Sequence, residues 1–195
     1  FIMECTLFQL FVVILMQCIR AEELGYNTLV NSKELAYYSD LKTLYKNFSL
    51  IAGMYETLEN FSTPYANVTA LSFDCKPSFF TYLKICAISA AQEMAIATFS
   101  LKPDKELLLS KLCHGCTDKY ESAKSELEKC ETNNRGDAWQ MCVLYTEIKA
   151  SCLKMDAYTY LAICQNKEAE NGEAIASLQH AIALHKDLKS SIKAY

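Results

Sequence analysis

Apolar residues recur at alternating steps of four and three across residues 109–130, the spacing that puts side chains on one face of an α-helix. A polar run rich in turn-forming residues follows at positions 131–136 and interrupts this periodicity. A second periodic stretch begins at position 141, so the two runs predict an antiparallel helical hairpin. The first stripe comprises Leu109, Cys113, Cys116, Tyr120, Ala123, Leu127 and Cys130. The second comprises Met141, Tyr145, Ile148, Cys152, Met155 and Tyr158.

Four cysteines lie symmetrically about the predicted turn. The midpoint of Cys116 and Cys152 is residue 134, and that of Cys130 and Cys142 is residue 136. In an antiparallel pair with a rise of about 1.5 Å per residue, each pair lies at one height along the helices. The spacing therefore predicts the disulfides Cys116–Cys152 and Cys130–Cys142.

Three further stretches have helical patterns. Residues 41–58 carry one apolar stripe, residues 79–101 are apolar nearly all round, and a last stripe runs from Ala174 through His185 to Tyr195. Pro77 suits the first turn of a helix, and His185 is expected to be a partly buried packing residue. The chain has only five glycines and three prolines. We predict an all-α fold, a disulfide-stapled four-helix up-down bundle with an N-terminal helical extension.

The chain begins with a short apolar core at residues 7–16, followed by a small residue at Ala21. This pattern is typical of a secretory signal. The alternative, a transmembrane anchor, needs about 20 apolar residues and is disfavoured. We predict a signal peptide at 1–21, an N-terminal helical extension and linker at 22–76, and a four-helix bundle domain at 77–195. The mature protein is expected to be extracellular and free of membrane.

Removal of the signal leaves eight cysteines, and an even number in an exported chain predicts disulfides. Cys75 and Cys86 either close a local loop or each reach another helix, and both options remain open. Asn47, Asn60 and Asn67 begin Asn-x-Ser/Thr sequons, which predict a glycoprotein.

Charge and motifs exclude several function classes. A formal net charge of −4 argues against nucleic-acid binding, which needs a basic patch. Cys113-His114-Gly115-Cys116 has neither a preceding strand nor a second paired motif, so we interpret its cysteines as structural. His180 and His185 lie on different helix faces and make no metal pair. No catalytic motif is present, so we expect neither an enzyme, a metal site nor a cofactor.

Residues 116–127 resemble the Cys-x-x-x-Tyr-x-x-Ala-x-x-x-Leu signature of the plant invertase and pectin methylesterase inhibitors. Residues 137–139 and 151–153 are similar to two further segments of that family. The resemblance implies a four-helix bundle preceded by a helical hairpin, with a disulfide between Cys116 and Cys152. The hairpin would correspond either to residues 29–41, which lack cysteines, or to the region of Cys75 and Cys86, where the spacing differs.

The resemblance further implies a secreted inhibitor of the cell wall and apoplast, a monomer that docks on an enzyme and occludes its active-site cleft. Pectin methylesterase is the preferred partner over invertase, because residues 133–139 lack the Pro-Lys-Phe segment of invertase inhibitors. Two alternatives remain: a secreted helical carrier of a small apolar ligand, or a family member without a target.

Overall fold

A computed structural model describes residues 34–66, 73–130 and 136–194 of the chain. These residues form five α-helices and two short 3-10 helices, with no strand in the described ranges, so the all-helical prediction is confirmed. The α-helices are α2 (Glu34–Ser62), α3 (Pro77–Ser100), α4 (Glu106–Glu128), α5 (Asp137–Lys167) and α6 (Asn171–Ala194). The 3-10 helices are η1 (Thr63–Tyr65) and η2 (Phe73–Cys75).

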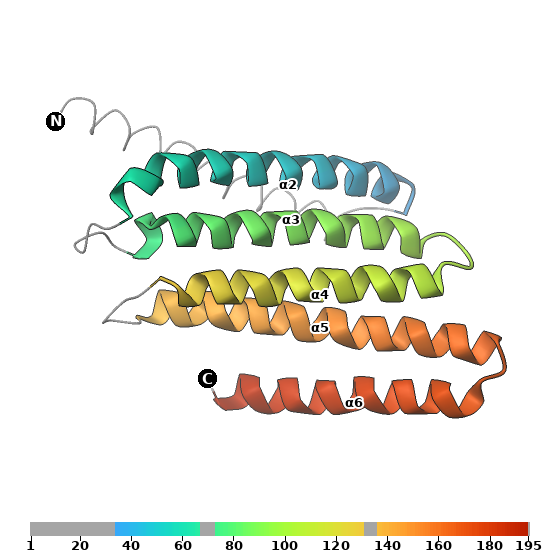
Figure 1. The fold of residues 1–195 in the computed structure, drawn as a ribbon. Coiled ribbons are helices and arrows are strands. Elements are labelled where there is room, and N and C mark those ends of the chain that lie inside the picture. The colour runs from blue at the N-terminus through green and yellow to red at the C-terminus, as the bar shows by residue number, and fades with distance from the viewer. Residues whose placement is uncertain (1–33, 67–72, 131–135, 195) are drawn as a thin grey trace.

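The five helices lie side by side in chain order and alternate in direction (Figure 1). Each packs chiefly against its neighbours in sequence, so that α2 and α6 form opposite ends of a row. The predicted four-helix bundle is therefore not confirmed. The helix expected to be an extension, α2, packs along α3, because its buried Leu44, Ile51 and Tyr55 supply a full apolar face. Within the described ranges, no helix is both long enough and apolar enough to span a bilayer.

The stripe predicted on α4 is the centre of the fold. All seven of its residues are at most 3% exposed, because α3 covers this face of α4 from one side and α5 from the other. The predicted hairpin of α4 and α5 is confirmed by the packing of these two helices. Pro77 begins α3, as predicted, and α3 is covered on most sides.

The stripe predicted on α5 is wrong at its first two residues, and its other four residues are only half-buried. Met141 is 62% exposed and Tyr145 is 43% exposed. The helix carries apolar residues on more than one face, and the face that α4 covers includes small and polar residues that contribute little to a hydropathy pattern. The buried residues of α5 are Val143, Thr146, Leu153, Ala157 and Ala162.

The stripe predicted on α6 is correct in part. Ala174 and Ala181 are buried, whereas Leu178 is 44% exposed and His185 lies in solvent, contrary to its predicted burial. As the last helix of the row, α6 packs along one narrow seam on α5. The buried side chains of α6 are all small, those of Ala174, Ser177 and Ala181, whereas Leu184 and Leu188 are half-buried. Tyr195 lies outside the described residues.

A polar network joins the three central helices. The hydroxyl of Tyr120 on α4 donates a hydrogen bond to Glu93 Oε1 of α3 at 2.5 Å. Lys149 Nζ of α5 binds Glu93 Oε2 at 2.6 Å. Burial, followed by the nearby Glu93 carboxylate, raises the pKa of Tyr120 far above its usual range, so the phenol remains a neutral donor. One half-buried carboxylate thus satisfies a donor from each neighbouring helix.

Replacing Tyr120 with Phe is expected to lower the free energy of unfolding by about 1–3 kcal/mol, because a buried carboxylate oxygen loses a charge-assisted hydrogen bond. Urea denaturation measures the change. The control is Tyr158→Phe, whose described contacts are ring contacts with His114 and His180. That control should change stability by less than about 0.5 kcal/mol. Equal effects in the two variants would contradict the role assigned to the network.

Candidate functional site

A groove of about 760 Å³ lies between α2 and α3, and it extends to Lys119 of α4. We call it the α2–α4 groove. Its floor is made of small residues from two helices, Ala52 and Gly53 of α2 and Ala91 and Ala95 of α3. A Cβ atom built on Gly53 would have no neighbour within 4 Å. The groove is open because the side chains at these positions are small. The backbone of a bound ligand can therefore approach its floor closely.

Apolar side chains are accessible along the groove. Ile88 is 39% exposed and is one of only two exposed residues of α3. Tyr45 of α2 is 47% exposed and lines the same groove. Solvent exposure of large apolar side chains beside a hollow is typical of a binding surface rather than of a packed core.

Charged groups flank this apolar floor. Lys84 Nζ of α3 lies 2.6 Å from Glu59 Oε2 and 3.7 Å from Glu56 Oε1 of α2, so ion pairs join the two helices at this side of the groove. Lys119 lies on the α4 side, and the described ion pairs do not include it. The amide Nε2 of Gln92 donates to the carbonyl of Leu112 at 3.0 Å, which fixes α3 against α4 at the groove. The arrangement suits an elongated ligand that is apolar on one side and charged at its edges.

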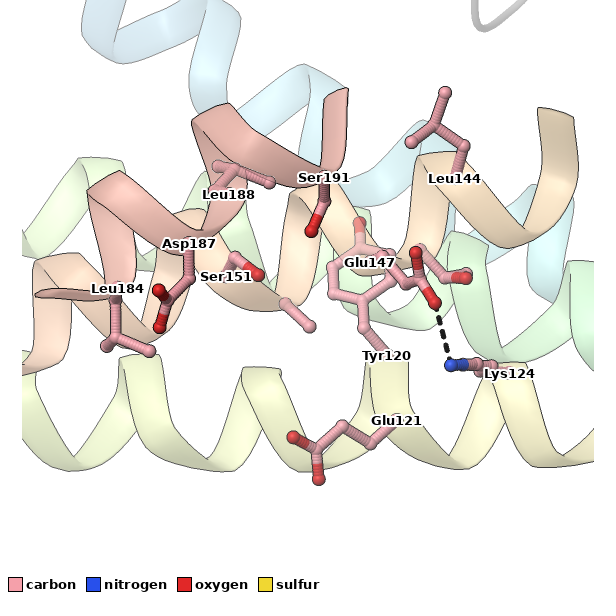
Figure 2. A pocket seen from close by; sticks show the side chains of 12 residues that line it. Tyr120, Glu121, Lys124, Leu144, Glu147, Ser151, Leu184, Asp187, Leu188 and Ser191 are labelled. Carbon is pink, nitrogen blue, oxygen red and sulfur yellow. Dashed lines mark hydrogen bonds and ion pairs between the residues drawn. The ribbon is translucent and has the colours of Figure 1, made fainter. Parts of the chain in front are cut away.

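A second groove, of about 310 Å³, lies on α4, α5 and α6 (Figure 2). Its lining includes Leu184 and Leu188 of α6, and Lys124 Nζ of α4 lies 2.7 Å from Glu147 Oε1 of α5 at its edge. We call it the α4–α6 groove. The two grooves share no residue. Among the described residues, no group of three or more His, Cys, Asp or Glu side chains could hold a metal ion.

The eight described cysteines are all free thiols, so the disulfide staples are not confirmed. Cys116 Sγ donates to the carbonyl of Ser89 at 3.4 Å, and Cys130 Sγ lies 3.0 Å from Ser78 Oγ. Burial raises the pKa of the Cys113 and Cys116 thiols to about 12, which makes them poor nucleophiles. No cysteine lines either groove. The pairings Cys116–Cys152 and Cys130–Cys142 stay predictions, as does disulfide bonding of Cys75 and Cys86, either with each other or with another helix.

The remaining predicted sites lie apart from the grooves. Asn47 and Asn60 are exposed on α2, and their glycosylation stays a prediction. Asn67, the predicted signal peptide at 1–21 and residues 29–33 of the first proposed hairpin position lie outside the described residues, whereas residues 34–41 belong to α2. The boundary proposed at residue 76 precedes α3 and also stays a prediction.

The sequence placed Tyr120 on a buried helix face, but none of the groove residues was predicted from the sequence to form a binding site. The one usable signal was Gly53, a glycine in the middle of a long helical pattern. Such a glycine weakens a helix, so its presence often marks a place where another group must approach the backbone closely. The alanines of α3 face it only because α2 and α3 pack together, which a single-helix pattern does not reveal.

The family of the chain is indicated by a sequence model of the BRO1-like domain, which matches residues 26–195. No curated protein matches in sequence. A crystal structure of ALIX in complex with the SIVmac239 PYKEVTEDL late domain is similar in fold, with a TM-score of 0.67 and 20% identity over 80% of this chain and 22% of that chain. The ALIX BRO1–CHMP4C complex gives the same TM-score and identity, over 80% of this chain and 42% of that chain. The present chain thus spans less than half the length of either.

These matches overturn the resemblance to the invertase and pectin methylesterase inhibitors. The secreted cell-wall inhibitor, its apoplastic location and its enzyme partner are therefore wrong, and neither the carrier nor the target-less inhibitor is supported. BRO1-like domains are protein-binding adaptor domains, so the prediction that the chain is not an enzyme is confirmed.

Replacing Gly53 with Ala is expected to raise the free energy of unfolding by about 0.5–1 kcal/mol, because the methyl group meets open space and the helix loses a flexible residue. Thermal or urea unfolding measures the gain. Gly172→Ala is a comparison with equally open surroundings, but it lies in the first turn of α6, where the gain should be smaller. A loss of stability in Gly53→Ala would contradict the open floor of the groove.

Proposed function

This chain belongs to the BRO1-like domain family, and on that premise we propose that its α2–α4 groove binds an amphipathic helix of a CHMP4-type ESCRT-III subunit. The protein then acts as an adaptor without chemistry of its own. The observation that carries the proposal is a groove of about 760 Å³ between the antiparallel helices α2 and α3, with a floor of small residues.

The dimensions and the chemistry of the groove support a helical ligand. Side chains of a third helix can enter the seam between α2 and α3, as ridges enter grooves in ordinary helix packing. The small floor at Gly53 and Ala91 lets the partner backbone come close. Ile88 and Tyr45 offer apolar contacts to the buried face of that helix. Binding of this kind uses anchors at helical spacing on the partner.

The charges at the edges support an amphipathic rather than a uniformly apolar partner. Lys84 is already paired with Glu59, whereas Lys119 is available to a carboxylate of the ligand. Because such a rim contact is exposed, it sets register and orientation more than affinity. The similar solved structure of the ALIX BRO1–CHMP4C complex supports the identity of the partner class.

Filling the groove with a larger side chain is expected to weaken this binding without destabilising the fold. Gly53→Leu places a side chain over the groove floor from an exposed helix position. We expect at least about tenfold weaker binding of purified CHMP4C, or about 1.4 kcal/mol, measured by isothermal titration calorimetry. Melting temperature should not fall, because Leu is a better helix former than Gly.

The matched control is Ser122→Leu, which adds the same side chain to an exposed position of α4 outside both grooves. It should bind CHMP4C like the unmodified chain. The proposal fails if the unmodified chain does not bind CHMP4C, or if Gly53→Leu and Ser122→Leu bind it equally well.

A further inference from the structure

The α4–α6 groove lies apart from the groove assigned above and is unexplained by it. We propose that it is a second peptide-binding site, which takes a segment carrying one arginine or lysine between apolar residues. The inference does not depend on the proposed binding of CHMP4, because it uses different helices and different side chains.

The walls of this groove provide the apolar contacts. Leu184 and Leu188 reach it from α6, and Leu144 reaches it from α5 (Figure 2). Its volume of about 310 Å³ is at the lower end of ordinary ligand pockets, so it suits one or two side chains rather than a whole helix. A short extended segment fits these dimensions.

The charge of the groove selects a cation. Three carboxylates line it, those of Glu121, Glu147 and Asp187, against the single ammonium group of Lys124. Lys124 and Glu147 neutralise each other at 2.7 Å. The ion pairs of the described residues include neither Glu121 nor Asp187, and both are exposed. Two carboxylates beside apolar walls attract a positive side chain more strongly than they would on an open surface.

Three aromatic side chains, one from each of α4, α5 and α6, lie next to one another beyond the groove. The ring of Tyr158 stacks on His180 at 5.4 Å and meets the edge of His114 at 5.5 Å. His114 precedes Glu121 by seven residues, and His180 precedes Asp187 by seven. Seven residues are about two helical turns, or roughly 10.5 Å.

Tyr158 likewise follows the groove residue Ser151 by seven residues, on a helix that runs in the opposite direction. All three rings therefore lie at the same end of the groove. A peptide whose basic side chain enters the groove would lay its next apolar side chain, about three residues along, over these rings.

The test measures binding of a fluorescein-labelled Gly-Leu-Arg-Gly-Ser-Leu-Gly peptide, in which the second leucine lies three residues after the arginine, to the full chain by fluorescence anisotropy. The same peptide with Glu in place of Arg serves as the comparison ligand. We expect the arginine peptide to bind, the glutamate peptide not to bind, and added salt to weaken the complex. The double variant Glu121→Gln with Asp187→Asn should weaken arginine-peptide binding about tenfold.

The matched control is Asp118→Asn with Glu128→Gln, which removes the same charge from exposed positions of α4 outside the groove. It should bind the arginine peptide like the unmodified chain. Equal binding of the two peptides, or equal losses in the two double variants, would overturn the proposal. Gly53→Leu should leave binding of the arginine peptide unchanged. The peptide measurement and the CHMP4C measurement therefore test the two proposals separately.

Discussion

The structure depends on the burial of one face of α4 between two neighbouring helices. Each residue of that face, from Leu109 to Cys130, is almost completely removed from water. Burial on this scale needs cover from both α3 and α5, and the Glu93 carboxylate is where the three helices are joined by polar contacts. Apolar burial gives most of the stability, while the network defines how the helices are placed along one another.

A row of helices differs from a bundle in what it leaves exposed. When each helix packs chiefly on its neighbours in sequence, a seam between two neighbours can stay uncovered by a third helix. Where seam residues are small, as at Gly53 and Ala91, the seam becomes a groove. Where the seam residues are leucines with a carboxylate between them, as on α6, the groove has apolar walls and a negative charge. One architecture can therefore present two unrelated binding surfaces without moving.

The resemblance to the cell-wall inhibitors failed for a physical reason. The spacing from Cys116 through Tyr120 and Ala123 to Leu127 is the spacing of any buried helix face. Cysteine in such a face behaves as a small apolar residue, so symmetric cysteines on two packed helices do not by themselves indicate disulfides. The leader-like start, the sequons and the paired cysteines each supported an exported protein, and it is the apoplastic location that the family match overturns.

The sequence by itself determined that the chain is helical, where its breaks fall, and which face of α4 is buried, because these follow from local periodicity and breakers. Only the tertiary structure decided that Met141 and Leu178 face outward, while Thr146 and Ala181 lie inside. It also decided that Gly53 of α2 and Ala91 of α3 line the same groove. A hydropathy pattern ranks residues within one helix, whereas these outcomes depend on which helix lies opposite and how closely it packs.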